Sequence, residues 1–215
     1  MQPKPAIALF ARAPIPGQVK TRLIGRFTPE QACDLHRAFV RDMWEMLVAF
    51  SAQAELFLYT DQEEKEWRAL AGPRVRLQRG GDLGKRMLRC FEEMQADGLG
   101  PLLILGSDSP ALPPAFIAPW SERLTCVTAL LGPAEDGGYY AIGCRTPHPR
   151  MFEGVNWSTR QTFAQTESAL RRCGFQPAYL PMYYDVDTFE DLCRLSAESH
   201  LPPHTRRWLG KNFGV

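Results

Sequence analysis

The sequence predicts an α/β protein in three layers, with helices on both faces of a mostly parallel sheet. Strand-length apolar runs alternate along the 215 residues with segments that have the apolar spacing of amphipathic helices. Parallel neighbours need such crossover helices, whereas antiparallel neighbours can be joined by a tight turn. The runs 126–131 and 139–143 are joined by a turn sequence that includes Asp136-Gly137-Gly138. We therefore expect a hairpin there and one antiparallel strand in the sheet.

Apolar runs of strand length predict seven strands within a single domain over residues 1–215. The expected strands lie at 7–11, 55–59, 74–78, 101–106, 126–131, 139–143 and 177–181. The run 101–106 is apolar throughout, which is typical of a central strand that is covered on both faces.

Apolar residues at helical spacing predict helices over 29–49, 62–71, 83–96, 159–172 and 188–197. Capping residues support their starts. The expected caps are Thr28 with Gln31 for the first helix, Asp82 for the third, Ser158 with Gln161 for the fourth and Thr188 with Asp191 for the last. The segment 199–215 is expected to be a tail packed through Trp208 and Phe213.

The composition excludes several classes of protein. With 25 Lys+Arg against 24 Asp+Glu and 45% apolar residues, the chain has a core and a nearly neutral field, which argues against a nucleic-acid partner. No apolar run approaches the roughly 18 residues of a membrane helix, and the first residues do not resemble a signal peptide. We therefore expect a cytoplasmic protein that does not bind membranes.

The cysteines and histidines do not form a recognisable metal motif. The six cysteines are widely spaced, so in a reduced compartment we expect them to be small core residues. His200 and His204 are four residues apart, but Pro202 and Pro203 between them prevent a helix from aiming both at one ion.

Ligands of open parallel sheets bind beyond the carboxyl ends of the strands, so the loops there are the candidate functional segments. The loop 11–23 contains Arg12, Gly17, Lys20 and Arg22, and cations in a strand-to-helix loop favour phosphate binding. It is not a glycine-rich P-loop, because prolines 14 and 16 remove two N–H donors. The alternative is a turn with solvated cations.

Three glycines and an acid occupy the loop 79–87. Gly80, Gly81 and Gly84 leave room for a nucleobase to lie against the backbone, and Asp82 is grouped with them as a nucleotide-binding candidate. Helix capping by Asp82 is the alternative interpretation.

Acidic residues at two further strand ends predict a metal site. Asp108 follows the central run 101–106, and Asp185 and Asp187 precede the last main helix. Carboxylates suit Mg²⁺ or Mn²⁺ bridging to a diphosphate, because without a cation the two anions repel each other. The alternatives are an N-cap for Asp108 and solvated turn acids for Asp185 and Asp187.

The hairpin loop 132–140 supplies the candidate catalytic carboxylates. Glu135 and Asp136 lie beside two glycines, as a general base or an acceptor-binding acid would. Asp136-Gly137-Gly138 is equally an ordinary hairpin turn. In the loop 156–161, Trp157 is a candidate for stacking on substrate, with a capping segment as the alternative.

Six segments, in this order, resemble a known bacterial family: FARAPIPGQVKTRL, GDLGKRM, LGSDSPAL, GPAEDGGYY, WSTRQT and DVDTFEDL. The family comprises GT-A-fold glycosyltransferase-like proteins associated with radical-SAM proteins or selenodomains, and is distantly similar to molybdenum-cofactor and phospholactate guanylyltransferases. The resemblance implies a nucleotide-diphospho-sugar transferase fold, with the first loop on the nucleotide phosphates, Asp108 in the acidic metal motif and the DVD segment near the metal. The chain departs from the guanylyltransferases in its first loop, where Ala13-Pro14-Ile15-Pro16 replaces a glycine-rich stretch.

Three functions follow as alternatives. The first is a glycosyltransferase that moves a sugar from a nucleotide-diphospho-sugar to a small acceptor with a divalent metal. The second is a nucleotidyltransferase that joins a nucleoside triphosphate to a phosphorylated acceptor. The third is a nucleotide-binding protein without catalysis. The sequence leaves the oligomeric state open.

Overall fold

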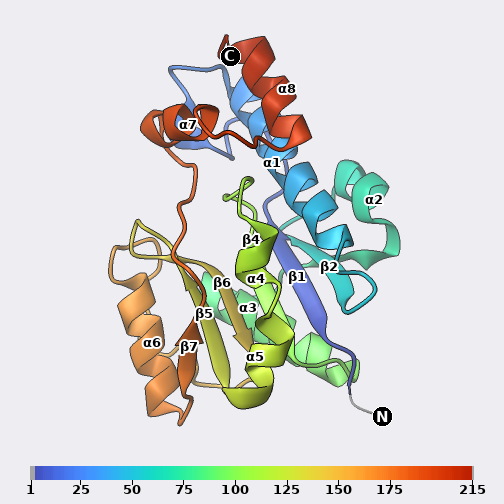
Figure 1. Cartoon of the computed structure of the whole chain (residues 1–215), viewed down its shortest axis with the longest axis vertical. Coiled ribbons are helices and arrows are strands. Elements are labelled where there is room, and N and C mark those ends of the chain that lie inside the picture. Colours follow the sequence, from blue (N-terminus) through green and yellow to red (C-terminus); the bar gives the residue numbers. More distant parts are fainter. Residues whose placement is uncertain (1–2, 215) are drawn as a thin grey trace.

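A computed structural model describes residues 3–214, and a seven-stranded sheet runs through the molecule (Figure 1). The strands are β1 (Ala6–Ala11), β2 (Glu55–Thr60), β3 (Val75–Leu77), β4 (Leu102–Gly106), β5 (Ala129–Pro133), β6 (Tyr139–Cys144) and β7 (Pro177–Tyr179). They lie in the order β3-β2-β1-β4-β6-β5-β7. β6 is antiparallel to both of its neighbours and the remaining pairs are parallel. This confirms the predicted mixed sheet with one antiparallel strand.

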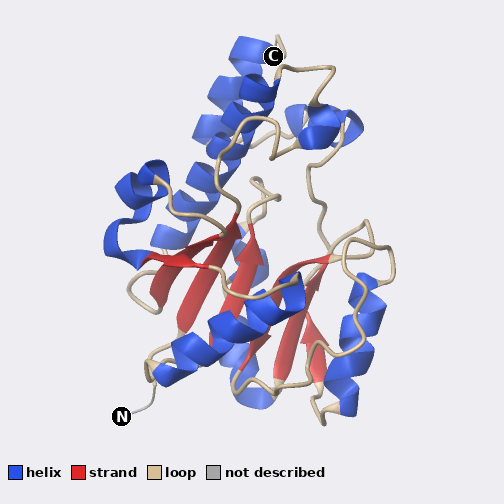
Figure 2. Ribbon diagram, turned by 180° about the vertical axis from the view of Figure 1, so that it is seen from behind, coloured by secondary structure: helices blue, strands red, loops and turns tan. Residues whose placement is uncertain are grey.

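Helices cover both faces of the sheet, as Figure 2 shows from behind. They are α1 (Pro29–Val48), α2 (Lys65–Ala71), α3 (Leu83–Ala96), α4 (Pro114–Ile117), α5 (Trp120–Cys126), α6 (Thr162–Arg172), α7 (Phe189–Ser196) and α8 (Pro203–Asn212). Alternate side chains of β1 pack on opposite faces of the sheet. Ile7 and Leu9 pack in the core with α1, α2 and α5, whereas Ala8 and Phe10 pack in the core with α3 and α6.

A third, smaller core lies beyond the carboxyl ends of β1 and β4, at the top of Figure 1. It joins the first half of α1 to α7 and α8 through Leu35, Phe39, Leu192 and Trp208. We call this assembly the cap. The predicted packing role of Trp208 is confirmed, and Phe213 packs against the same core.

Several predicted elements need correction. The segment predicted as a packed tail contains a helix that was not predicted, because α8 begins at Pro203, where proline is favourable in a first turn. The strand predicted at 126–131 begins only at Ala129, since Cys126 ends α5, in which Trp120 and Leu124 are buried at helical spacing. The last strand ends at Tyr179, two residues sooner than predicted.

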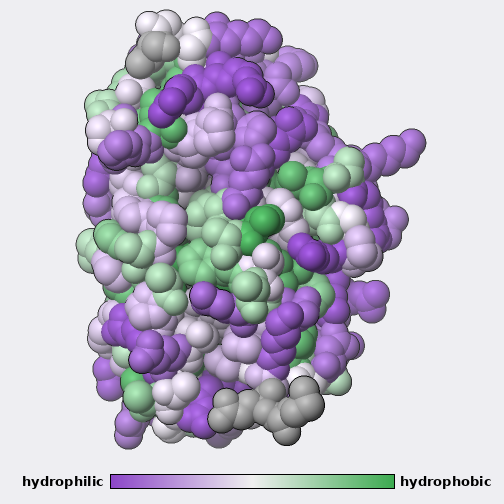
Figure 3. Space-filling model, turned by 45° about the vertical axis from the view of Figure 1, so that its right-hand side comes forward, coloured by the Kyte–Doolittle hydropathy of each residue, from purple (hydrophilic) through white to green (hydrophobic). Residues whose placement is uncertain are grey.

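The caps and cysteines match the sequence in part. Two of the three predicted capping boxes, Thr28 with Gln31 and Thr188 with Asp191, are present. All six cysteines are free, but the core prediction is wrong for Cys126 and Cys193, which are exposed. Hydrophilic side chains cover most of the face drawn in Figure 3, and hydrophobic ones gather near its middle. In the part of the chain that the structure describes, no helix combines the length and the apolar character needed to cross a membrane.

Candidate active site

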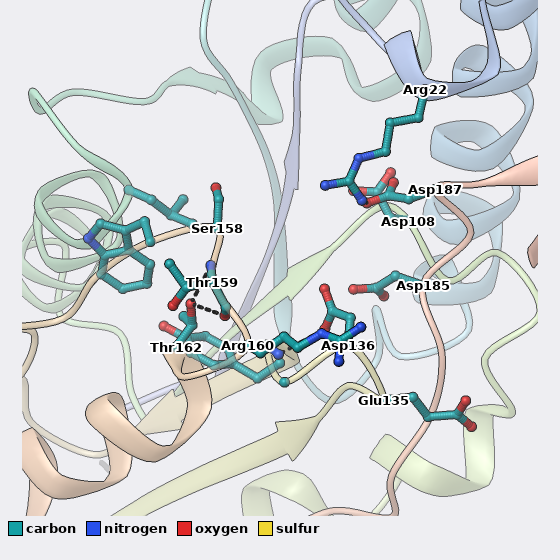
Figure 4. Close-up of a pocket in the computed structure, with 15 residues that line it drawn as sticks. Arg22, Asp108, Glu135, Asp136, Ser158, Thr159, Arg160, Thr162, Asp185 and Asp187 are labelled. Carbon is teal, nitrogen blue, oxygen red and sulfur yellow. Dashed lines mark hydrogen bonds and ion pairs between the residues drawn. The ribbon is translucent and has the colours of Figure 1, made fainter.

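A cleft opens between the cap and the carboxyl ends of the strands, and it has two chambers. The first chamber, about 580 Å³, is lined by residues of the loop after β1 and by Gln78. The second chamber, about 890 Å³, is lined by the β5–β6 turn and by residues 157–160. Asp108, Asp185 and Asp187 line both chambers. The predicted acids therefore meet where the chambers join (Figure 4).

The ammonium group of Lys20 lies among these acids. Its Nζ donates to Asp108 Oδ1, to Asp187 Oδ1 at 3.1 Å and to the Val186 carbonyl at 2.7 Å. An ammonium group has three N–H donors, so all of them are used. Burial by itself would lower the pKa of Lys20, but the carboxylates of Asp108 and Asp187 raise it above its ordinary value. Lys20 is therefore a fixed cation at neutral pH.

The backbone turns Lys20 inward. Lys20 has left-handed dihedral angles, φ 47° and ψ 40°, immediately before the short 3₁₀ turn Thr21–Leu23. Its side chain is 3% exposed and its Nζ lies 5.2 Å from the centre of the Phe39 ring. The direct phosphate contact predicted for Lys20 would need a rearrangement of these hydrogen bonds.

The other cations of the loop remain open to the cleft. The side chain of Arg22 is 70% exposed, and its Nη1 lies 3.9 Å from Asp187 Oδ2. Arg12 is 59% exposed and donates from Nη1 to the Gln18 carbonyl at 2.7 Å. Both guanidinium groups keep donors for an anion, so their phosphate contact stays a prediction. Gly17 has φ +80° with open space around it, which suits the turn interpretation.

The three cleft acids have oxygens to offer to a divalent cation. Lys20 holds one oxygen of Asp108 and one of Asp187, and the Ser109 hydroxyl donates to Asp185 Oδ1. Within residues 3–214, no protein group donates to the second oxygen of Asp108 or of Asp185. Mg²⁺ commonly takes one or two carboxylates and completes its shell with water and substrate phosphate. The donor set fits such an ion, and the metal role of these acids stays a prediction.

Asp185 also has a shifted titration. Burial, together with the nearby Asp108 carboxylate, raises the pKa of Asp185 to about 7. Asp108 differs: burial opposes its ionisation, but the Lys20 ammonium outweighs burial and lowers the pKa of Asp108 below its ordinary value. Two carboxylates of one site thus have opposite tendencies to hold a proton near neutral pH.

A second acidic group lies at the junction of α1 and α8. The ligand atoms of Asp42, Glu45 and His204 lie within 4.8 Å of one another, a composition that is possible for a metal site. Asp42 also accepts from the backbone N–H groups of His204 at 2.9 Å and Thr205 at 2.7 Å. Its carboxylate therefore caps the first turn of α8.

The two predicted catalytic carboxylates differ in their surroundings. Both oxygens of Glu135 are held by Arg194, at 2.6 and 3.0 Å, and Glu135 points away from Asp136 in Figure 4. Asp136 accepts from the N–H of Gly138 at 2.8 Å, as the turn interpretation expects, and it lines the second chamber. Its second oxygen receives no protein hydrogen bond in the described chain, so a catalytic role is open to Asp136 and remains a prediction.

The loop 79–87 combines capping with open backbone. Asp82 accepts from the N–H of Lys85 at 2.8 Å, which confirms that it caps α3. A Cβ atom added at Gly80 would lie only 2.8 Å from the backbone nitrogen of Arg86, so the backbone of Gly80 is covered by its neighbours. A Cβ atom added at Gly81 would have no atom within 4 Å, so the backbone there is open. The predicted nucleobase contact of this loop remains a prediction.

Gly84 and Trp157 form a packing contact. A Cβ at Gly84 would lie 2.6 Å from the Trp157 indole and 2.9 Å from Phe152 Cβ. Gly84 is therefore covered by a side chain instead of being open to a base. Trp157 lines the second chamber with its remaining surface, and its stacking on substrate stays a prediction.

The capping box predicted for Ser158 and Gln161 is wrong. Gln161 is the N-cap of α6 without a side-chain hydrogen bond, and the Thr162 hydroxyl accepts from the N–H of Thr159 at 3.2 Å. Ser158 has φ +60°, an uncommon conformation for serine, and it lines both chambers.

His36 and Gln78 are among the polar residues of the first chamber that sequence reasoning missed. His36 Nε2 lies 3.0 Å from the Arg12 carbonyl, and the Trp67 indole N–H donates to the same carbonyl at 3.1 Å. Together they fix the start of the loop after β1. Gln78 directly follows β3, and a polar residue at the end of a strand was the available signal.

Comparisons with known proteins agree with this geometry. Residues 36–159 match the model of a family described as "Uncharacterized protein conserved in bacteria (DUF2064)". The crystal structure of a "putative nucleotide-diphospho-sugar transferase" from Desulfovibrio desulfuricans G20 is 30% identical, with a TM-score of 0.88 over 99% of this chain and 96% of that chain. No curated protein matches the chain significantly.

More distant solved structures share the fold. A cytidylyltransferase from Leptospira borgpetersenii serovar Hardjo-bovis is 16% identical, with a TM-score of 0.59 over 99% of this chain and 96% of that one. A CMP:2-keto-3-deoxy-manno-octonic acid synthetase complexed with CTP is 15% identical, with a TM-score of 0.53 over 90% of this chain and 97% of that one. These matches confirm the predicted GT-A-like, nucleotidyltransferase-like fold.

Proposed function

Because this chain belongs to the bacterial protein family DUF2064, we propose that it is a transferase that moves a sugar from a nucleotide-diphospho-sugar to a small acceptor. The observation that carries the proposal is the buried ammonium of Lys20 between Asp108 and Asp187. Cleavage of a sugar–diphosphate bond leaves negative charge on the diphosphate. Lys20 holds Asp108 and Asp187 in place where the chambers join, and the exposed guanidinium group of Arg22 beside them has free donors to stabilise that charge.

The two chambers bind different parts of the substrates. The first chamber, with Arg12, Arg22 and the open Gly81 loop nearby, takes the nucleotide. The larger second chamber takes the sugar and the acceptor. The similarity to a protein named as a nucleotide-diphospho-sugar transferase supports this division.

Acidic residues complete the site. The oxygens of Asp108 and Asp185 that receive no protein hydrogen bond, together with Asp187, would hold Mg²⁺ or Mn²⁺, which supplies further charge stabilisation to the diphosphate when bound. Asp136 lines the second chamber, where it orients the acceptor and accepts the proton that the acceptor hydroxyl loses.

A binding screen tests the proposal. Nucleoside diphosphates, triphosphates and nucleotide-sugars are compared by calorimetry with and without Mg²⁺ or Mn²⁺. We expect metal-dependent binding of a nucleotide-sugar, followed by its turnover with an acceptor. Release of pyrophosphate from a triphosphate would instead support nucleotidyl transfer, and binding without metal dependence or turnover would support a non-catalytic protein.

Asp108→Asn sharpens the screen. We expect this variant to fold, to lose metal-dependent binding and to slow turnover by roughly 10², the scale of removing one electrostatic stabiliser. Asp97→Asn, at the surface end of α3, is the matched control and should leave both unchanged. Unchanged metal-dependent binding in Asp108→Asn would place the metal elsewhere.

A further inference from the structure

We infer that Gln78 recognises the nucleobase in the first chamber by presenting a hydrogen-bond acceptor that requires a donor on the edge of the base. The inference rests on the proposed function, because it takes the first chamber as the nucleotide site. Gln78 lines that chamber, and no part of the proposed chemistry uses it.

The orientation of the Gln78 amide follows from its neighbours. Its Nε2 donates to the Ala11 carbonyl at 3.3 Å and to the Tyr59 carbonyl at 2.9 Å. Both neighbours are backbone carbonyls, which only accept, so the nitrogen must face them. The two N–H groups of the amide are thereby used. Within the described residues nothing donates to Oε1, which is left as an acceptor.

The amide is also held in place from its own backbone. The N–H of Gln78 donates to the Thr60 carbonyl at 2.8 Å, which extends the pairing of β3 with β2 by one residue. The side-chain amide cannot turn over to present a donor without breaking both of its own hydrogen bonds. Such a fixed group discriminates between ligands more strongly than a free side chain does.

The position of Gln78 suits the base end of a nucleotide. In the order β3-β2-β1-β4, Gln78 follows β3 and Asp108 follows β4. Neighbouring strands lie about 4.8 Å apart, so the ends of β3 and β4 are separated by roughly 14 Å, and the Gln78 side chain reaches back toward β1. A nucleoside diphosphate with its phosphates near Asp108 spans this distance. Gly81 lies three residues after Gln78, and the space beside its backbone is open.

The chemistry sets the rule of selection. The amino groups of adenine and cytosine and the ring N–H groups of guanine and uracil can all donate to Gln78 Oε1. Purine and 2-pyrimidinone have no such donor, and they would leave the acceptor unpaired in the chamber. A site that is built to pair a polar group rejects analogues that leave this group unpaired.

The first arm of the test uses the parent protein. The four common nucleoside diphosphates are titrated by calorimetry with Mg²⁺, and the tightest is compared with the diphosphate of purine riboside or of 2-pyrimidinone riboside. We expect the analogue to bind at least tenfold more weakly. Equal affinities would overturn the role of Gln78 and leave the proposed function intact. No binding of any nucleoside diphosphate would overturn both.

The second arm uses a matched pair of variants. Gln78→Met keeps the length of the side chain but removes the acceptor, so the natural and analogue diphosphates should bind within about threefold of each other. Gln18→Met, in the same chamber, should keep the parent's discrimination. Discrimination that survives in Gln78→Met would overturn the inference. If Gln78→Met does not fold, the analogue series on the parent decides.

Discussion

Two ion-pair systems join the cap to the sheet, and they differ in exposure. Lys20 is 3% exposed beneath Asp108 and Asp187, whereas Arg194 and Glu135 are 49% and 46% exposed at the rim of the cleft. Both systems link segments that are far apart in the chain. In the first, an uncompensated charge would stay buried if a partner were removed, whereas in the second, water replaces the lost partner.

The difference shows that hydrogen-bond geometry by itself does not predict which of the two ion-pair systems contributes more to stability. The Glu135–Arg194 pair has two hydrogen bonds, and the Arg194 guanidinium also lies 3.8 Å from the centre of the Tyr184 ring. Exposed pairs nevertheless contribute little, because solvent and salt screen them. Because Lys20 is buried, it depends on its acidic partners more than the exposed Arg194 does. Substitutions in the buried system should therefore lower the free energy of unfolding much more than substitutions at the rim.

The largest effect is expected for Lys20→Met. Removing the ammonium leaves Asp108 and Asp187 facing each other without their cation, and we expect a loss of about 2–3 kcal/mol in the free energy of unfolding. This is below the roughly 3–5 kcal/mol of a fully buried pair because both acids reach solvent. Urea unfolding at pH 7 measures it. Lys85→Met, whose lysine is 72% exposed beside Asp82, is the control, and an equal loss in both variants would contradict the prediction.

A smaller loss is expected for Asp108→Asn. Lys20 keeps Asp187 and the Val186 carbonyl, and asparagine can still accept one hydrogen bond, so we expect a loss of about 1–2 kcal/mol. The same urea series measures it. In the double variant Lys20→Met/Asp108→Asn the two losses should not add, because both remove one interaction. Additive losses would mean that Lys20 and Asp108 act independently.

His36 gives the buried region a pH dependence of stability between pH 7 and 5. Burial lowers the pKa of His36 below its ordinary value of about 6.5. Below about pH 6.5, the unfolded chain takes up a proton on His36 before the folded chain does. The stability that comes from a neutral, buried His36 is therefore present above about pH 6.5 and is lost as the pH falls below that value. This part is at most about 1.4 kcal/mol per pH unit. His36→Gln, which keeps a donor for the Arg12 carbonyl, should show a shallower decline between pH 7 and 5. Identical slopes would contradict the assignment.

The smallest effect is expected for Glu135→Gln. The pair is half exposed, so we expect a loss below about 1 kcal/mol at low salt, and a smaller one at 1 M salt. Thermal unfolding at two salt concentrations measures it. A loss as large as that of Lys20→Met would show that the rim pair supports the cap as strongly as the buried one.

Local features of the fold were predictable from the sequence, and the contacts of the cleft were not. Thr28, Asp82 and Thr188 cap their helices through residues three positions away, which a single segment of sequence displays. The partners of Lys20 lie 88 and 167 residues further along the chain. The loops that carry them could be identified as strand ends, but no pattern shows that a lysine is turned inward toward two acids.

Gly84 and Ser158 illustrate the same limit. A glycine in a loop is compatible with a ligand or with a neighbouring side chain, and only the fold brings the Trp157 indole over Gly84. The sequence around Ser158 has the composition of a capping box, but Ser158 has a left-handed backbone and α6 begins only at Thr162, without a side-chain cap from Gln161. Adjacent prolines such as Pro202 and Pro203 usually indicate a break in helical structure, but here the second of them begins helix α8, which packs on α1.

The cap joins α1, near the start of the chain, to α8, near its end, so the cleft beneath the cap can form only late in synthesis. A ribosome that has completed β4 has released Lys20 and the strands around it, but Val186, Asp187 and Trp208 have not yet been made. At that stage the chain has the residues of four of the seven strands, and the Lys20 ammonium has none of its three acceptors, because Asp108 also follows β4. The charged centre is thus one of the last parts to form, and a fragment released before Asp187 has been added would lack it.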